Sequence, residues 1–348
     1  MKEHTIKNRL TTVFLSVFIA ISVSAQQKQS TCSGSLTAAN KEYEAGRFSQ
    51  CVEILKPCIE NLSAEVQFEA YRLMALSYIN QNENEKTHEA IVNLLRHKPD
   101  YRDFPYFDPL EFTKLLAKYD VWALLEMGMK GGMNFNTVRP IKNYSVTGSP
   151  AEFSPGTGYQ AGFVAEYFFR KNISVDAEFL YEGLNYGRKA TNVSGWSQEF
   201  TEKLNYFNIP VTGRYYFYRW NALQFAAELG MQMQLFNATN SNIILKNNIT
   251  GENVQNTIEQ SKQRSSTLYY ALAGLAVKYK LGGGNLCLNA RYAYGFSNIV
   301  NADKRYDDLD FILANQYVDS DISFNPLYIS LGYQFPLQGL YVVKLSKK

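Results

Sequence analysis

The chain contains 348 residues, with 35 Lys and Arg against 32 Asp and Glu, and its formal net charge is +3. Such a small excess of positive charge gives no reason to expect a nucleic-acid partner. No apolar run after residue 25 reaches the roughly 18 residues that a membrane-spanning helix requires, so any membrane span must consist of strands.

Residues 1–25 have the features of a secretory signal peptide. Basic residues precede the apolar stretch 13–23, and Val23, Ser24 and Ala25 provide a small-residue cleavage site. No Cys follows directly, so a lipid anchor at the mature amino terminus is not expected. The signal predicts export to an oxidising periplasm, where disulfides can form.

Residues 26–120 are predicted to form a small all-α domain of helical hairpins. Small and apolar residues between Ala38 and Cys58 have the spacing of two helices separated by a turn at Gly46, and a looser copy follows at 71–95. The first copy resembles a tetratricopeptide repeat, and the second departs from the pattern because residues 81–86 replace the tight Gly turn. Two such repeats bury little core, so we expect this domain to pack against a capping helix, the rim of the strand region or a partner.

A further short helix is predicted from about residue 109 to residue 118. Asp108 would provide its N-cap, Pro109 suits the first turn, and Glu111 would complete a capping box. This helix would directly precede the first strand.

Three cysteines, Cys32, Cys51 and Cys58, lie in the helical region, and Cys287 lies far from them. If residues 35–61 form an antiparallel helical hairpin, its open end brings Cys32 near Cys58, and a disulfide there would stabilise by roughly 3–4 kcal/mol. Alternatively, Cys51 and Cys58 are one heptad apart and pack as small apolar residues. No His accompanies the cysteines at zinc spacing, so neither a metal site nor another cofactor is expected.

Residues 121–337 alternate between apolar and polar side chains in eight runs, each of which ends at a turn or a polar loop. This pattern predicts an eight-stranded antiparallel transmembrane β-barrel, so the fold class is α + β, with an all-α domain followed by the barrel. The alternative, an antiparallel sandwich, would not need so charged a face opposite its apolar one. The predicted strands cover residues 122–136, 158–170, 173–189, 203–218, 223–238, 266–281, 285–298 and 324–337.

The predicted connections alternate between short turns and long polar loops, as in outer-membrane barrels. Because the number of strands is even, both chain ends would lie on the side of the short turns, in the periplasm. The helical domain and a C-terminal tail, residues 338–348, are therefore predicted to be periplasmic. The last long loop is rich in Asp but lacks the ligand spacing of a calcium site, so we expect a solvated outer loop. The short turns cover residues 170–172, 219–222 and 282–284, and the long loops cover residues 138–156, 190–202, 241–264 and 300–322.

Ten charged residues test the register of these strands, because a Lys or Arg that faces lipid costs roughly 2–4 kcal/mol. All ten fall on the face opposite the apolar residues, so we expect them to fill the barrel interior as an ion-pair network. Arg214 and Arg291 would lie at its centre among the acids. The predicted interior charges are Glu126, Lys130, Glu166, Asp176, Glu178, Glu182, Arg214, Glu228, Lys278 and Arg291.

The segment 204–211, followed by Arg214 and Phe217, resembles the corresponding strand of small outer-membrane β-barrel proteins of the Bacteroidetes, the PorT-like barrel family. The closing segment 325–335 is similar to the last strand of that family, including the terminal aromatic residue used in barrel insertion. The resemblance covers residues 121–337 and implies a location in the outer membrane. Some relatives serve the type IX secretion machinery, but the added helical domain departs from the simplest members, so that role is not carried over.

The sequence therefore predicts a non-enzymatic outer-membrane anchor, in contact with lipid, whose residues 26–120 bind a periplasmic or envelope protein. His88 and His97 lie in the helical domain and none lies in residues 121–337, which removes His-dependent acyl transfer from the barrel. The alternative function is transport, as a narrow channel or a component of a type IX secretion-like machinery. An enzyme acting on lipid or surface glycan would need carboxylates alone or a metal.

Overall fold

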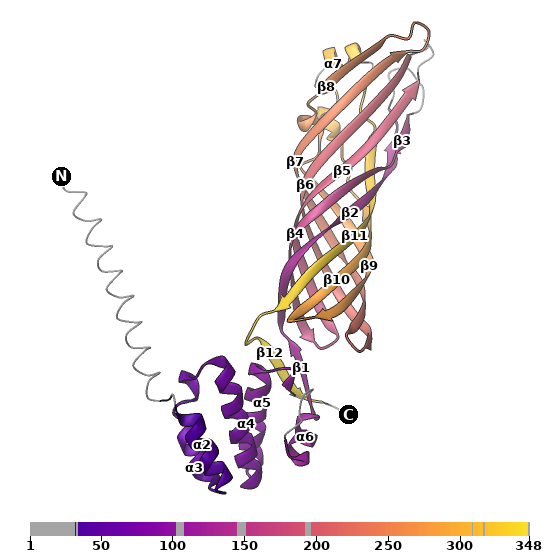
Figure 1. The fold of residues 1–348 in the computed structure, drawn as a ribbon. Coiled ribbons are helices and arrows are strands. Elements are labelled where there is room, and N and C mark those ends of the chain that lie inside the picture. The colour runs from indigo at the N-terminus through magenta and orange to yellow at the C-terminus, as the bar shows by residue number, and fades with distance from the viewer. Residues whose placement is uncertain are drawn as a thin grey trace, which may run out of the picture. The chain divides into compact units, whose positions relative to one another are not determined.

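The protein divides into two compact units in a computed structural model (Figure 1). The first unit contains the residues up to Trp122 together with the last residues, Gln338–Lys348, and the second contains Ala123–Leu337. The predicted signal peptide lies outside the described residues. Among the described residues, no helix combines the length and the apolar composition needed to cross a membrane. The structure describes residues 32, 34–101, 108–144, 151–191, 196–307, 309–315 and 317–346.

Five α-helices form most of the first unit in its described residues. Helix α2 packs on α3 and helix α4 packs on α5, so the predicted helical hairpins are present. Gly46 has a φ of +75°, the left-handed conformation that the tight turn between α2 and α3 requires and that glycine adopts without strain. Small residues such as Ala39, Cys51 and Ala75 are fully buried where helices pack closely. The helices are α2 (Ser35–Glu44), α3 (Phe48–Leu55), α4 (Ala64–Asn80), α5 (Asn84–His97) and α6 (Leu110–Leu116).

Asp108 does not cap α6, contrary to the sequence prediction. The helix begins at Leu110, and Pro109 occupies the N-cap position without a side-chain cap. The Asp108 carboxylate instead accepts hydrogen bonds from Arg72 at 2.6 and 2.8 Å and from the hydroxyl of Tyr101 at 2.7 Å. Burial and this carboxylate raise the pKa of Tyr101, so its hydroxyl stays a donor. A long-range ion pair therefore replaces the local cap and attaches α6 to α4.

The residues after the barrel return to the helical unit. Strand β12 (Tyr341–Leu345) pairs with strand β1 (Tyr119–Ala123) in a two-stranded sheet. The backbone amide of Ser346 donates to the carbonyl of Lys118 at 2.7 Å, and Val343 packs against the apolar core of the helices. Residues 338–346 are therefore part of the helical unit and not a separate tail.

Val343 provides a test of this arrangement. We expect Val343→Ser to destabilise the helical unit by about 1 kcal/mol, because it replaces a half-buried apolar side chain that packs on the core with a polar one. The matched control is Leu345→Ser, since Leu345 is already 54% exposed on the same strand. Hydrogen exchange of α5 would report the difference. Equal protection in both variants would contradict the packing of β12 on the helices.

The second unit is a ten-stranded sheet, antiparallel throughout, that closes on itself as a barrel (Figure 1). Its pairings lead from β2 through β4, β5, β6, β7, β9, β10 and β11 and return to β2. Strand β3 pairs with β5 outside this ring, and β8 pairs with β7. The strands are β2 (Leu125–Lys142), β3 (Glu152–Ser154), β4 (Gly156–Arg170), β5 (Ile173–Thr191), β6 (Trp196–Trp220), β7 (Leu223–Asn247), β8 (Asn253–Ile258), β9 (Thr267–Leu281), β10 (Gly284–Gly295) and β11 (Asp321–Pro336).

Strands β6 and β7 are longer than the sequence predicts. Each has 25 residues, so much of the predicted loop 190–202 and the start of the predicted loop 241–264 belong to the sheet. The alternation continues through this part of β6, where Phe200 is buried and Thr201 and Lys203 are exposed. The outward residues are polar here, which made the segment look like a loop.

The barrel has an apolar outer wall and a polar interior along much of its length. On β7, Leu229 is 73% exposed, whereas its neighbour Glu228 is 2% exposed. The same inversion recurs on other strands, where Phe163 and Leu331 point outward and Glu166 and Ser330 are buried. Lipid is the solvent that favours such an outer wall.

Candidate functional site in the barrel interior

Arg214 lies at the centre of the charged interior. Its guanidinium contacts Glu166 on β4 and Asp176 on β5, each at 2.7 Å, and Glu228 on the neighbouring strand β7 at 2.5 Å. All four residues are buried. Arginine suits this position because its fixed, planar group of donors can bind several carboxylates at once.

Arg291 on β10 forms a second centre that shares acids with the first. It contacts Glu178 at 2.8 Å, Glu228 at 2.5 Å and Asp176 at 3.2 Å. The two arginines thus hold Asp176 and Glu228 between them. Burial of a charge is offset only when partners and hydrogen bonds surround it. Glu228 meets that condition at both carboxylate oxygens, whereas both arginines bind Asp176 through the same oxygen, Oδ2.

Two lysines extend the network. Lys130 contacts Glu178 at 2.8 Å, and Lys278 contacts Glu126 at 2.7 Å and Glu166 at 2.6 Å. The network joins strands β2, β4, β5, β6, β7, β9 and β10. Its side chains therefore connect most of the barrel wall across the lumen.

Glu182 differs from the other predicted interior charges. Its carboxylate accepts hydrogen bonds from the side-chain amides of Asn208 at 2.7 Å, Gln234 at 2.8 Å and Asn134 at 3.3 Å. Within the described part of the chain, no salt bridge joins Glu182 to a base. The expectation that all ten charges form ion pairs is therefore wrong at this residue, where neutral donors replace a cation.

Beyond Glu182, the interior becomes apolar, which the sequence analysis missed. The inward side chains of β5, β6, β9 and β11 are aromatic or aliphatic at this level and pack as one buried cluster. The sorting of charges by face could not find it, because these positions carry no charge. The cluster contains Leu184, Tyr186, Phe200, Leu204, Tyr206, Ile243, Leu268, Tyr270, Leu272, Ala293, Ile299, Tyr317, Ile322, Phe324 and Tyr328.

A second set of buried charges surrounds Arg264, which precedes β9. Arg264 contacts both carboxylate oxygens of Glu202 at 2.8 Å and the carboxylate of Asp319 at 3.0 Å. The hydroxyl of Tyr317 also donates to Asp319 at 2.7 Å. The segment 317–320 is buried against the barrel, so the prediction of a solvated loop at 300–322 is wrong for this part.

The interior is suited to a structural role. Arg214, Arg291 and Lys278 each contact two or more acids, and no His occurs in residues 121–337 to act as a base. Among the described residues, no group of three or more His, Cys, Asp or Glu has a metal-binding arrangement. The charged layer and the apolar cluster occupy successive levels of the lumen. The Arg264 contacts lie among residues of the cluster, since the Tyr186 hydroxyl donates to Glu202 at 2.7 Å.

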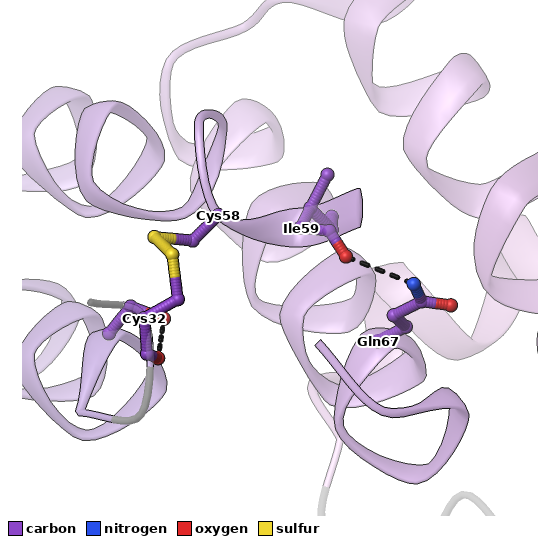
Figure 2. The surroundings of a disulfide bond; sticks show 5 residues. Cys32, Cys58, Ile59 and Gln67 are labelled. Atoms are coloured by element: carbon purple, nitrogen blue, oxygen red, sulfur yellow. Dashed lines mark hydrogen bonds between the residues drawn. A yellow bond between two sulfur atoms is a disulfide. The ribbon is translucent and has the colours of Figure 1, made fainter. Parts of the chain in front are cut away.

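The cysteines define a second site, in the helical unit. A disulfide joins Cys32 to Cys58, whose Cα atoms are 5.5 Å apart (Figure 2). Cys51 is free and fully buried in the helical core. The carbonyl of Ile59, which follows Cys58, accepts a hydrogen bond from Gln67 on α4 at 3.0 Å (Figure 2). The disulfide thus fixes the start of α2 beside the connection between α3 and α4.

Removal of this disulfide should affect the helical unit alone. We expect Cys32→Ser to lower its free energy of unfolding by roughly 3 kcal/mol, because a loop of 26 residues is no longer closed in the unfolded state. Unfolding of the helices can be followed by circular dichroism with and without reductant. The parent should respond to reductant and Cys32→Ser should not. A parent that is insensitive to reductant would contradict the prediction.

Comparisons with known proteins agree with this fold. A family model described as outer membrane protein beta-barrel domain matches residues 117–301, which are 185 of the 348 residues. A comparison with curated proteins finds no match.

Several solved outer-membrane proteins resemble the chain at low identity. OprG from Pseudomonas aeruginosa is 14% identical, with a TM-score of 0.36, and the match covers 62% of this chain and 98% of that one. A major outer membrane protein from Thermus thermophilus is 13% identical, with a TM-score of 0.33, and the match covers 61% of this chain and 99% of that one. Neisserial surface protein A is 13% identical, with a TM-score of 0.31, and the match covers 63% of this chain and 99% of that one. Because the family model matches more than half of its residues, the chain belongs to the family of outer membrane protein β-barrel domains.

Proposed function

We propose that this protein is a non-enzymatic outer-membrane anchor, an eight-stranded transmembrane barrel whose tetratricopeptide-like helical unit binds a protein partner in the periplasm. Residues 1–25 would direct its export, and the short turns would face the periplasm. The filled interior of the barrel is the main support for this proposal. Ion pairs and an apolar cluster occupy the lumen, so the barrel is suited to anchoring. Recognition of a partner would then be the role of the helical unit.

The helical unit has the features of a small interaction module. Its two hairpins share a buried core, and β1 and β12 supply the further packing that two repeats need. The core takes up the apolar faces of the helices, while polar residues such as Asn40 on α2 and Glu89 on α5 remain exposed. A partner would bind this polar outer surface. The resemblance of the barrel to the PorT-like family is compatible with an envelope partner.

Site-specific photocrosslinking in cells tests the docking role. A photoreactive amino acid would replace Asn40 or Glu89, and a matched control would carry it at Asn256, which is exposed on β8. The proposal predicts that both helical positions crosslink to the same envelope protein and that the control position does not. Failure of both helical positions to crosslink, in protein that is correctly inserted, would contradict the docking role.

A conductance measurement distinguishes the anchor from the transport alternative, a narrow channel or a component of a type IX secretion-like machinery. The ion pairs and the apolar cluster should block the lumen to ions. Purified full-length protein in planar bilayers is therefore expected to show no steady conductance. A steady, voltage-independent current would favour a channel and remove the main support for the anchor.

A further inference from the structure

The three short turns of the barrel carry the same pair of residues, an aromatic residue followed by a base. The pairs are Phe169 and Arg170 at the end of β4, Tyr218 and Arg219 at the end of β6, and Tyr279 and Lys280 at the end of β9. All six side chains are exposed. The repetition is not required by the turns themselves, which differ in length and in sequence.

The three turns that carry these bases are neighbours in the barrel. The Arg219 side chain donates a hydrogen bond to the carbonyl of Lys171 in the neighbouring turn. The backbone amide of Lys280 donates to the carbonyl of Ala222 at 2.9 Å, which joins the next pair of turns. We call this group, Arg170, Lys171, Arg219 and Lys280, the basic arc.

No acid lies in the turns that carry the basic arc. The segments 169–173, 217–223 and 279–285 contain no Asp or Glu. The opposite end of the barrel is different, because Lys189 and Lys246 there both contact Glu199, at 3.1 and 3.2 Å. The group at the short turns therefore has no acid of its own, whereas the two lysines at the opposite end share one.

The basic arc borders the apolar outer wall. Phe169 and Trp220 are each 59% exposed beside its bases, and aromatic residues of this kind lie at the boundary between lipid chains and headgroups. Bases next to such a boundary reach lipid phosphates, while their aliphatic stems stay on the apolar side. We propose that the basic arc binds the headgroups of anionic phospholipids in the leaflet at the short turns. The inference is independent of the proposed docking role.

Trp220 provides a local reporter for the lipids in contact with the arc. The chain has three tryptophans, so Trp122→Phe with Trp196→Phe leaves Trp220 as the only one. The full-length protein would be placed in bilayers of phosphatidylcholine that contain a small fraction of brominated phosphatidylglycerol or brominated phosphatidylcholine. Quenching of Trp220 by each brominated lipid gives their relative association at the arc. We expect phosphatidylglycerol to be favoured about threefold or more at low salt, with the preference decreasing as salt screens the charges.

Two sets of substitutions, made in this single-tryptophan protein, test whether the arc causes the preference. The arc variant carries Arg170→Gln, Arg219→Gln and Lys280→Gln, and the preference should fall to about one. A control with three Gln substitutions at the opposite end should keep the full preference, as should Arg170→Lys with Arg219→Lys, which retains the charge and confirms that folding is intact. A preference near one in the parent, or an unchanged preference in the arc variant, would overturn the proposal. The control substitutions are Lys189→Gln, Lys203→Gln and Lys246→Gln.

Discussion

Replacement of Arg214 by Met is expected to destabilise the barrel by about 3–5 kcal/mol. The substitution retains much of the side-chain volume but leaves Glu166, Asp176 and Glu228 buried with fewer cationic partners. Urea unfolding in lipid vesicles, followed by tryptophan fluorescence, would measure the loss. The midpoint should shift to lower urea concentration, while the slope stays constant because the same surface is exposed on unfolding.

Lys189→Met is the matched control for this prediction. Lys189 forms an exposed ion pair with Glu199 on the outside of the barrel, and such pairs contribute less than about 1 kcal/mol. A double variant that also replaces Glu228 by Gln should recover part of the loss, since one uncompensated charge is removed. If the Arg214→Met variant were as stable to urea as the Lys189→Met variant, the interior network would not be what holds the barrel wall together.

Arg264→Met should cost a similar amount, about 3–5 kcal/mol, at the opposite end of the interior. The substitution leaves Glu202 and Asp319 buried without their shared cation. Since Asp319 belongs to the connection before β11, we expect this connection to leave the barrel wall. Limited proteolysis of the folded protein should then cleave near residue 319, where the parent is resistant.

Lys262→Met controls for changes elsewhere in the same connection, because Lys262 is exposed two residues before Arg264. It should leave both the proteolysis and the stability unchanged. If Arg264→Met retained the resistance of the parent, the apolar contacts of Tyr317 with the buried cluster would suffice to hold the segment.

The features that the sequence predicted well are those set by strong local rules. A charge that faces lipid is so costly that Arg214, Glu178 and the other predicted interior charges had to point inward, and all ten are buried. The helical hairpins likewise follow from the spacing of small residues and from Gly46. Each of these signals lies within one or two neighbouring elements.

The features that were missed depend on partners far away in the sequence. Asp108 has all the local requirements of an N-cap, yet Arg72, 36 residues earlier, binds its carboxylate. Asp319 looks like a residue of a solvated loop until Arg264, 55 residues away, is placed beside it. The extended part of β6 has polar residues such as Thr201 and Lys203 on its outward face, so this face does not resemble a lipid-facing strand.

The pairing of β12 with β1 has a consequence for the order in which the protein matures. The helices are made first, but the strand that completes their sheet and packs against their core follows all the barrel strands in the sequence. The amino-terminal module therefore cannot reach its final state until every barrel strand has been synthesised and delivered. Completion of the helical unit is in this way delayed until the barrel strands have been made.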